Sequence, residues 1–314
     1  MYDSRKLVLV GTGMVGMSMA YDLEIQGLIN ELVLIDINKD KAIGEAMDLS
    51  HGLSCAPSRM VITAGEYEDC HDADIVVITA GVAQKPGETR LELAERNASI
   101  VKDITEKVMA SGFKGVFVVA TNPVDLMSYV VYKTSNLPAS QIIGSGTVLD
   151  SARLRHIIAT KLEVAPKNVH AFIMGEHGDS SFAVWSHSYI GAVPLCDLLR
   201  QKGIDEKTFC EEAYKEVQQS AYEIIERKGA TYYAIGMALT TIVKAIINNE
   251  REVLTVSTHL GGKYGHDDIF IGVPTIVNHR GAKDIFEIPL SEDEKEKLDN
   301  SVKVLEEMKN KLGL

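Results

Sequence analysis

The feature that most constrains this chain is a glycine-rich turn between a short apolar run and an amphipathic stretch. The apolar run KLVLV at 6–10 leads directly into GTGMVG at 11–16, which fits the pattern GxGxxG, and Asp36 ends the next apolar run twenty positions beyond Gly16. Glycines alone also mark ordinary turns. The pattern here is more specific, because a strand, this turn, a helix and an acid follow one another at the required spacing. It predicts a dinucleotide-binding βαβ unit.

The chemistry of a dinucleotide explains these residue types. Glycines let the main chain approach a pyrophosphate, whose negative charge is stabilised by the exposed N–H groups at the start of the helix. Asp36 can accept hydrogen bonds from ribose hydroxyls, and its charge would repel a 2′-phosphate, so we expect NAD rather than NADP. The alternative, that Asp36 caps the next helix, is weaker because that helix is expected to begin at Asn38 or Lys39.

Apolar and amphipathic stretches alternate through the first half of the chain, as expected for buried parallel strands covered by helices. The predicted strands are 6–10, 32–36, 60–64, 75–80, 115–120 and 141–144, and the predicted helices are 14–27, 39–50, 90–111 and 123–134. This pattern predicts a doubly wound α/β fold of the Rossmann type, with ligands bound at the carboxyl ends of the strands.

The pattern changes after about residue 145. We expect helices at 147–160, 207–228, 230–248 and 291–311, and strands at 168–175, 252–258 and 268–277. The sequence is therefore divided into an NAD-binding domain at 1–144 and an α+β substrate domain at 145–314. No Ser- or Pro-rich linker separates the two halves, so we expect them to pack as one unit with a cleft between them.

The bulk composition argues against several classes of function. The 314 residues can bury a large core, and the formal charge of -12 opposes binding to nucleic acid or to an anionic membrane. The four cysteines show no metal or disulfide spacing, and the histidines do not cluster with carboxylates, so no metal site is expected. We find no signal-peptide pattern and no apolar stretch long enough to span a bilayer, and we therefore expect a cytoplasmic location.

Two segments combine polar residues with glycine or proline at the expected ligand edge of the sheet. A turn-rich stretch at 81–90 follows the fourth strand, and we expect it to be mobile and able to close over a ligand. TNPVD at 121–125 follows the fifth strand. Asn122 can reach the nicotinamide end of the cofactor, or it can cap a helix with Pro123 at the first position, and the two roles are compatible.

Two later segments carry charge in unusual settings. Asp150 and Arg153 share one face of a predicted helix, although an exposed ion pair at this spacing contributes at most about 0.5 kcal/mol and implies no function. GEHGD at 175–179 places His177 in a glycine-flanked turn after an apolar strand. A structural role is the default for a lone histidine, so its assignment depends on the other segments.

Together these segments resemble the L-lactate/malate dehydrogenase family, and more closely its lactate branch. The strings GTGMVGMSMA, LIDI, AGVAQKPGETRLEL, TNPVD, GSGTVLDSARLR, GEHGDSS and KGATYYAIG occur in the family's order over nearly the whole chain. Several such strings in register are far more specific than any one of them. The resemblance implies an NAD-dependent oxidoreductase that moves a hydride between the nicotinamide and a small 2-hydroxy acid.

The resemblance implies roles that reduction of a 2-keto acid also requires. His177 would be the acid/base, because an imidazole that titrates near neutral pH can exchange a proton with the substrate oxygen in both directions. Asp150 would fix the tautomer of that imidazole. Arg153 would bind the substrate carboxylate in a two-pronged pair, and Arg90 on the closing loop would polarise the carbonyl.

Further positions border the two ligands in the family. Asn122 and Thr231 lie beside the substrate. The cofactor-binding positions correspond to Gly11, Gly13, Met14, Val15, Gly16, Asp36, Lys41, Tyr67, Gly81, Val82, Ala120, Asn122 and Ser145.

Gln84 bears on which acid is used, because malate dehydrogenases carry an arginine at this position that pairs with the second carboxylate of oxaloacetate. A neutral amide leaves that carboxylate without a partner, whereas an arginine facing a methyl group would be a buried unpaired cation costing several kcal/mol. Pyruvate and L-lactate are therefore the expected pair. Larger 2-keto acids stay open, because a wall made of Gln84, Thr231 and apolar neighbours can be roomier than the resemblance reveals.

Arg155 and His170 suggest a second ligand. On a helix Arg155 is turned about 200° from Arg153, and His170 stands in an apolar strand, so the residues alone favour a surface arginine and a hydrogen-bonded core histidine. In bacterial lactate dehydrogenases activated by fructose 1,6-bisphosphate, an arginine and a histidine at these positions from paired subunits bind its phosphates. The resemblance therefore implies an allosteric bisphosphate site at a two-fold interface of a homotetramer.

Two alternative functions are compatible with the same fold. A malate dehydrogenase is opposed mainly by Gln84. A non-catalytic NAD-binding sensor on the same fold is expected to have lost the hydride-transfer residues, but Arg90, Asp150, Arg153 and His177 are all present.

Overall fold

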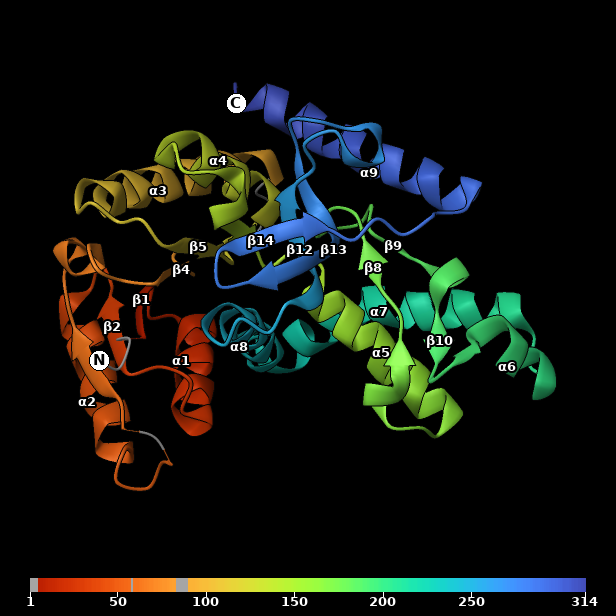
Figure 1. Ribbon diagram of the computed structural model, residues 1–314, viewed down its shortest axis with the longest axis horizontal. Helices are drawn as coiled ribbons and strands as arrows, with labels where there is room; N and C mark the ends of the chain where they lie inside the picture. Colours follow the sequence, from red (N-terminus) through yellow and green to blue (C-terminus); the bar gives the residue numbers. More distant parts are fainter. Residues whose placement is uncertain (1–4, 58, 83–89) are drawn as a thin grey trace.

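The computed structural model describes residues 5–57, 59–82 and 90–314, and Figure 1 shows their arrangement. The first half contains the strands β1 (Lys6–Val10), β2 (Glu31–Ile35), β3 (Val61–Ala64), β4 (Ile75–Ile78), β5 (Val116–Val119) and β6 (Ile142–Gly144), and the helices α1 (Met14–Gln26), α2 (Lys39–Gly52), α3 (Arg90–Ala110) and α4 (Val124–Ser135). Each of these elements matches a predicted strand or helix to within two residues at either end. The predictions for the first half are confirmed.

The six strands of the first half are parallel and lie in the order β3-β2-β1-β4-β5-β6. Strands covered by helices on both faces must be apolar on both faces, and every residue of β1, β4 and β5 is buried. Because the six strands are parallel, their carboxyl ends meet at one edge of the sheet, as a doubly wound fold requires.

The second half contains more short elements than the sequence predicts. Its helices are α5 (Val148–Leu162), α6 (Leu195–Gln201), α7 (Glu206–Lys228), α8 (Tyr233–Ile247) and α9 (Glu292–Lys311), and its strands are β7 (Val169–His170), β8 (Ile173–Met174), β9 (Phe182–Ala183), β10 (Tyr189–Ile190), β11 (Val193–Pro194), β12 (Glu252–His259), β13 (Phe270–Asn278) and β14 (Gly281–Ile285). The sequence analysis missed α6, β9, β10, β11 and β14, because elements of two to seven residues are too short to show a periodic pattern.

The single strand predicted at 168–175 is wrong. The segment is divided into β7, which pairs with β10, and β8, which pairs with β9. The apolar run therefore changes hydrogen-bonding partners at Ala171 and Phe172, and a sequence pattern does not reveal such a change.

The large sheet continues into the second half of the chain. β12 runs antiparallel to β6 with Ser257 opposite Gly144, and β13 and β14 extend the sheet to nine strands in the order β14-β13-β12-β6-β5-β4-β1-β2-β3. The sheet thus crosses the domain boundary predicted at residue 144, and that division stays a prediction.

The apolar core lies in layers on the two faces of this sheet. Helices α3, α4 and α9 cover one face, and α1, α2 and α8 cover the other (Figure 1). A third core joins α5 and α7 to the short strands of the second half. None of the helices within the described ranges is both long and apolar enough to cross a membrane.

Candidate active site

A cavity of about 570 Å³ has walls formed by the segments that follow β1, β2 and β4. Seven of the predicted cofactor residues line it, namely Gly11, Gly13, Asp36, Lys41, Tyr67, Gly81 and Val82. Ile35, Ile37 and Ile104 line it as well and add apolar surface. A polar turn beside apolar side chains suits a ligand that has both phosphates and flat rings.

The glycines of the turn differ in what surrounds them. Gly11 has a φ of +104°, and a Cβ there would collide with the main chain of Ala80. A Cβ at Gly16 would collide with the carbonyl oxygen of Gly11, so Gly16 serves close packing of α1 on the sheet. Among the described residues, a Cβ at Gly13 would meet no atom within 4 Å, and no side chain caps the helix that Gly13 begins. The space and N–H groups at Gly13 therefore fit a pyrophosphate.

Asp36 is fixed at the cavity wall by hydrogen bonds. Its Oδ2 accepts from the main-chain N–H of Thr12 at 2.8 Å and from the Thr12 hydroxyl at 2.9 Å, and Oδ1 accepts from the N–H of Asn38. Burial would raise the pKa of Asp36, but these hydrogen bonds and the charge of Lys41 lower it below its usual value. Asn38 caps α2, so the alternative in which Asp36 caps that helix is wrong.

Six predicted cofactor residues do not line this cavity, namely Met14, Val15, Gly16, Ala120, Asn122 and Ser145. Met14 is exposed on the first turn of α1, and Ser145 is buried with its N–H bonded to the carbonyl oxygen of Val119. Asn122 lines the neighbouring cavity described next. Contacts from these positions to a cofactor stay predictions.

A second cavity, of about 340 Å³, contains the predicted proton-transfer group. Asp150 lies in the first turn of α5, and its Oδ2 is 2.7 Å from Nδ1 of His177. Its Oδ1 accepts a hydrogen bond of 3.0 Å from Nη1 of Arg153. Asn122 lines the same cavity, and so do Ala221 and Ile225 of α7. The structure thus brings together side chains from four segments that are distant in sequence.

The exposed ion pair considered for Asp150 and Arg153 is wrong, because their side chains are only 13% and 12% exposed. An ionised carboxylate only accepts hydrogen bonds, so Nδ1 of His177 carries a proton and the tautomer is fixed. Burial would raise the pKa of Asp150, but His177 and Arg153 hold it below its usual value. Burial would lower the pKa of His177, but the charge and hydrogen bond of Asp150 outweigh that effect and raise it.

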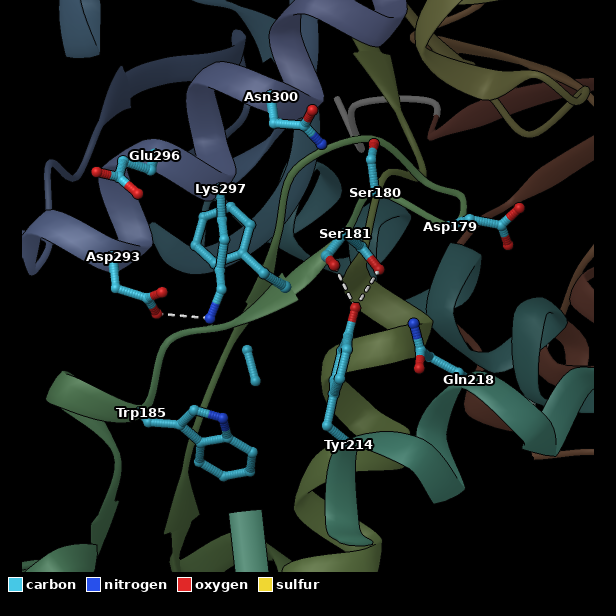
Figure 2. Close-up of a pocket in the computed structure, with 12 residues that line it drawn as sticks. Asp179, Ser180, Ser181, Trp185, Tyr214, Gln218, Asp293, Glu296, Lys297 and Asn300 are labelled. Carbon is cyan, nitrogen blue, oxygen red and sulfur yellow. Dashed lines mark hydrogen bonds and ion pairs between the residues drawn. The ribbon is translucent and has the colours of Figure 1, made fainter. Parts of the chain in front are cut away.

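The turn that carries His177 is held from several sides. Gly175 exchanges two main-chain hydrogen bonds with Gly272 of β13, which fixes the start of the turn to the large sheet. The Ser301 hydroxyl of α9 accepts from the N–H of Glu176 at 2.7 Å. Figure 2 shows the far side of the turn, where the Tyr214 hydroxyl of α7 is hydrogen-bonded to Ser181.

A buried carboxylate also holds the turn, and the sequence analysis gave it no role. Asp125 Oδ2 accepts from the main-chain N–H of His177 at 2.8 Å. Asp125 stands in TNPVD, so its position in a charged segment after a strand was a usable signal. Tyr214 and Ser301 stand in ordinary amphipathic helices, where nothing in the sequence distinguishes them.

Some predicted substrate residues are not placed in the cavity. Thr231 lies between α7 and α8 and does not line it. Gln84 lies outside the described residues, and for Arg90 only the main chain, at the start of α3, is described. Pro123 rather than Asn122 is the N-cap of α4, so Asn122 does not cap that helix.

The two residues predicted to bind an effector lie near each other. Arg155 is partly buried; its Nε donates to the carbonyl oxygen of Ala171 at 3.2 Å, and its guanidinium lies 5.7 Å from the ring centre of Phe172. His170 precedes Ala171 and is exposed, so the core histidine considered for this position is wrong. Among the described residues, no group of three or more His, Cys, Asp or Glu side chains is arranged to hold a metal ion.

Two family models match adjoining parts of the sequence. Residues 5–144 match the NAD-binding domain of lactate/malate dehydrogenases, and residues 147–313 match the alpha/beta C-terminal domain of the same enzymes. The chain belongs to the lactate/malate dehydrogenase family. It is therefore an NAD-dependent oxidoreductase, and NAD is its cofactor.

Individual members of the lactate/malate dehydrogenase family are similar over nearly their whole length. L-lactate dehydrogenase 2 of Bacillus cereus is 52% identical over 303 residues, which cover 96% of each chain. L-lactate dehydrogenase of Macrococcus caseolyticus is 52% identical over 97% of this chain and 96% of its own. The crystal structure of the ligands-bound minor L-lactate dehydrogenase from Enterococcus mundtii superposes with a TM-score of 0.96 at 49% identity, covering 98% of both chains.

The glycine turn yields a direct test of the cofactor site. Gly13→Ala is expected to weaken NADH binding by about 1–3 kcal/mol, the usual cost of a methyl group forced into a packed contact. It should leave the free energy of unfolding almost unchanged, because the new Cβ meets no atom of the described residues. Gly16→Ala should lower the free energy of unfolding itself. Fluorescence titration with NADH measures the binding, and urea unfolding measures the stability. If Gly13→Ala binds NADH as tightly as wild type, the assignment of this turn as the pyrophosphate site is wrong.

Proposed function

We propose that this chain is an L-lactate dehydrogenase, which reduces pyruvate with NADH to L-lactate and catalyses the reverse reaction. The observation that carries the proposal is the hydrogen-bonded group of His177, Asp150 and Arg153 in one cavity. Asn122 lines this cavity after β5, at the same edge of the sheet as the glycine turn after β1. The similar proteins named L-lactate dehydrogenase support the choice of substrate.

His177 supplies the proton. NADH, when bound, provides the hydride for the carbonyl carbon. The protonated imidazole gives its Nε2 proton to the carbonyl oxygen, while Asp150 holds Nδ1 and keeps the ring oriented. In the reverse direction the neutral imidazole takes the proton from the hydroxyl of lactate. Burial lowers the pKa of His177, but Asp150 raises it above its usual value, which favours the protonated form that pyruvate reduction needs.

Arg153 positions the substrate. One of its N–H groups is bonded to Asp150, which leaves others on the planar guanidinium for the carboxylate of pyruvate. Ala221 and Ile225 give the cavity an apolar wall that suits a methyl group. We place Arg90 at the carbonyl oxygen, and Asn122 and Thr231 beside the substrate.

Gln84 selects against a second carboxylate. An amide offers no charge to pair with oxaloacetate, and the desolvation of an unpaired carboxylate is unfavourable. Pyruvate is therefore preferred to oxaloacetate in our proposal, although the family includes enzymes for both.

The substrate assignment is tested by following NADH oxidation with pyruvate, oxaloacetate and 2-ketoisocaproate. The wild-type chain should use pyruvate best. Gln84→Arg should raise kcat/KM for oxaloacetate and lower it for pyruvate, because the new cation has a partner only in oxaloacetate. A wild-type preference for oxaloacetate would make the chain a malate dehydrogenase, and unchanged ratios in the variant would remove Gln84 from the specificity argument.

We further propose a cytoplasmic homotetramer activated by fructose 1,6-bisphosphate. Its phosphates would bind Arg155 and His170, which lie on adjacent segments because Arg155 donates to the main chain of Ala171. Positive charges that face each other across a two-fold axis oppose tight assembly until phosphates neutralise them, which couples the effector to substrate affinity. Large apolar side chains exposed on α1, α2 and α8 support assembly with further copies of the chain. They are Tyr21, Ile25, Ile43, Met47, Tyr233 and Met237.

Effector binding is tested by pyruvate saturation curves with and without fructose 1,6-bisphosphate at neutral pH. The KM for pyruvate should fall when the bisphosphate is added, and Arg155→Gln should abolish that change. Arg200→Gln is the matched control, because Arg200 is an exposed arginine paired with Asp197 on α6. An unchanged KM in the wild-type chain would end the regulatory proposal and leave the catalytic one intact.

A further inference from the structure

The main chain of the catalytic turn is bonded to a second carboxylate. Asp125, in the first turn of α4, accepts the N–H of His177 at Oδ2 and the hydroxyl of Ser257 at Oδ1, over 2.8 Å and 2.6 Å. Asp125 is 2% exposed, and Ser257 is fully buried in β12. Asp125 lines neither of the two ligand cavities, so it lies behind His177 rather than beside a ligand.

We propose that Asp125 is a positioning residue for proton transfer: its carboxylate fixes the main chain of the turn, and its negative charge stabilises the protonated imidazole of His177. The inference rests on the proposed function, because that reaction requires His177 to be protonated in one direction and neutral in the other.

A purely structural role does not explain why the acceptor is an acid. An amide at position 125 would accept the same N–H and could still be bonded to the serine hydroxyl. A buried carboxylate is costly unless a positive charge compensates for it. Among the described residues no lysine or arginine forms an ion pair with Asp125, so its charge is compensated by the N-terminal end of α4 and by the imidazolium of His177.

The charges of the two groups depend on each other. Burial raises the pKa of Asp125 to about 6, against the opposing effect of the hydrogen bonds from Ser257 and His177. The carboxylate is therefore ionised at neutral pH. Burial lowers the pKa of His177, whereas the charge and hydrogen bond of Asp150 raise it, and the charge of Asp125 raises it further.

Other charged groups around His177 are left in place by a change at Asp125. They are Asp150 and Arg153 of α5 and Glu176 and Asp179 of its own turn; the titratable but neutral Tyr214 of α7 also lies beside the turn. Because none of them is altered, a shift in the titration of His177 reports the missing carboxylate.

The test compares wild type with Asp125→Asn, which keeps the size and the acceptor but removes the charge. Histidine ring nitrogens of the full-length labelled protein are titrated by NMR without substrate, and His177 is identified among the nine histidines by its loss in His177→Asn. The pKa of His177 should fall by about one unit, the low end of the effect of a nearby opposite charge. An unchanged pKa would overturn the proposal.

Kinetics provide a second readout. Pyruvate reduction needs the protonated imidazole, so its kcat/KM falls as pH rises through the pKa of His177, and Asp125→Asn should move that fall to lower pH by the same amount. Lactate oxidation needs the neutral imidazole, so its kcat/KM rises as pH rises through the pKa of His177. Asp125→Asn should also move that rise to lower pH. General damage to the fold would lower kcat/KM in both directions without moving either profile along the pH axis.

Two further variants separate charge from geometry. Ser257→Ala keeps the carboxylate but removes a bond that favours its ionised form, so it should lower the pKa of His177 by less than Asp125→Asn does. If Asp125→Asn does not fold, Ser257→Ala alone tests the proposal, because it should still lower the pKa of His177. Ser301→Ala removes a neutral hydrogen bond to the N–H of Glu176 and should not move the titration. Equal shifts in Ser301→Ala and Asp125→Asn would show that geometry alone matters, which would contradict the proposal.

Failure of this inference is distinguishable from failure of the proposed function. If the wild-type chain does not reduce pyruvate, the proposed function is wrong, but the NMR titration still decides whether Asp125 stabilises the imidazolium. If the wild-type chain reduces pyruvate and Asp125→Asn leaves the pKa of His177 unchanged, only the proposed role of Asp125 is wrong.

Discussion

The carboxylate of Asp150, only 13% exposed, is tolerated because a positively charged or protonated group lies on each side of it. The helix start at α5, the imidazole of His177 and the guanidinium of Arg153 together compensate its charge. Loss of either side chain would leave a buried charge unpaired, at a cost of several kcal/mol. The charge balance therefore fixes the geometry, and it places a proton donor and a carboxylate-binding cation on the wall of one cavity.

The continuous sheet explains why distant segments meet at this cavity. The glycine turn follows β1 at one position in the sheet, while the catalytic turn begins at Gly175, which is bonded to Gly272 of β13. Both turns are therefore anchored to the same rigid element. Hydrogen bonds from α4, α7 and α9 then hold the catalytic turn from its far side. The substrate half and the cofactor half share a framework rather than meeting as separate bodies.

The sequence predicts those features that have a local pattern. Fully buried strands are predicted from apolar runs, and the phosphate site is predicted from the turn from Gly11 to Gly16. Both patterns consist of residues that are neighbours in the sequence. The pairing of Asp150 with His177 came from resemblance, since spacing alone left a surface ion pair open. The role of Asp125 was missed because its bonds span 52 and 132 residues of sequence, and no local pattern marks such contacts. Thr231 does not line the cavity, and its place beside the substrate stays a prediction.

The central claim is that an imidazole oriented by a buried acid transfers the proton. The most direct measurement is kcat/KM for pyruvate reduction by Asp150→Asn, together with the affinity of that variant for NADH. The account predicts that kcat/KM falls by about 10²- to 10⁴-fold, the usual contribution of a positioned acid, while NADH binding is unchanged because Asp150 does not line the dinucleotide cavity. A variant that reduces pyruvate as fast as wild type would contradict it.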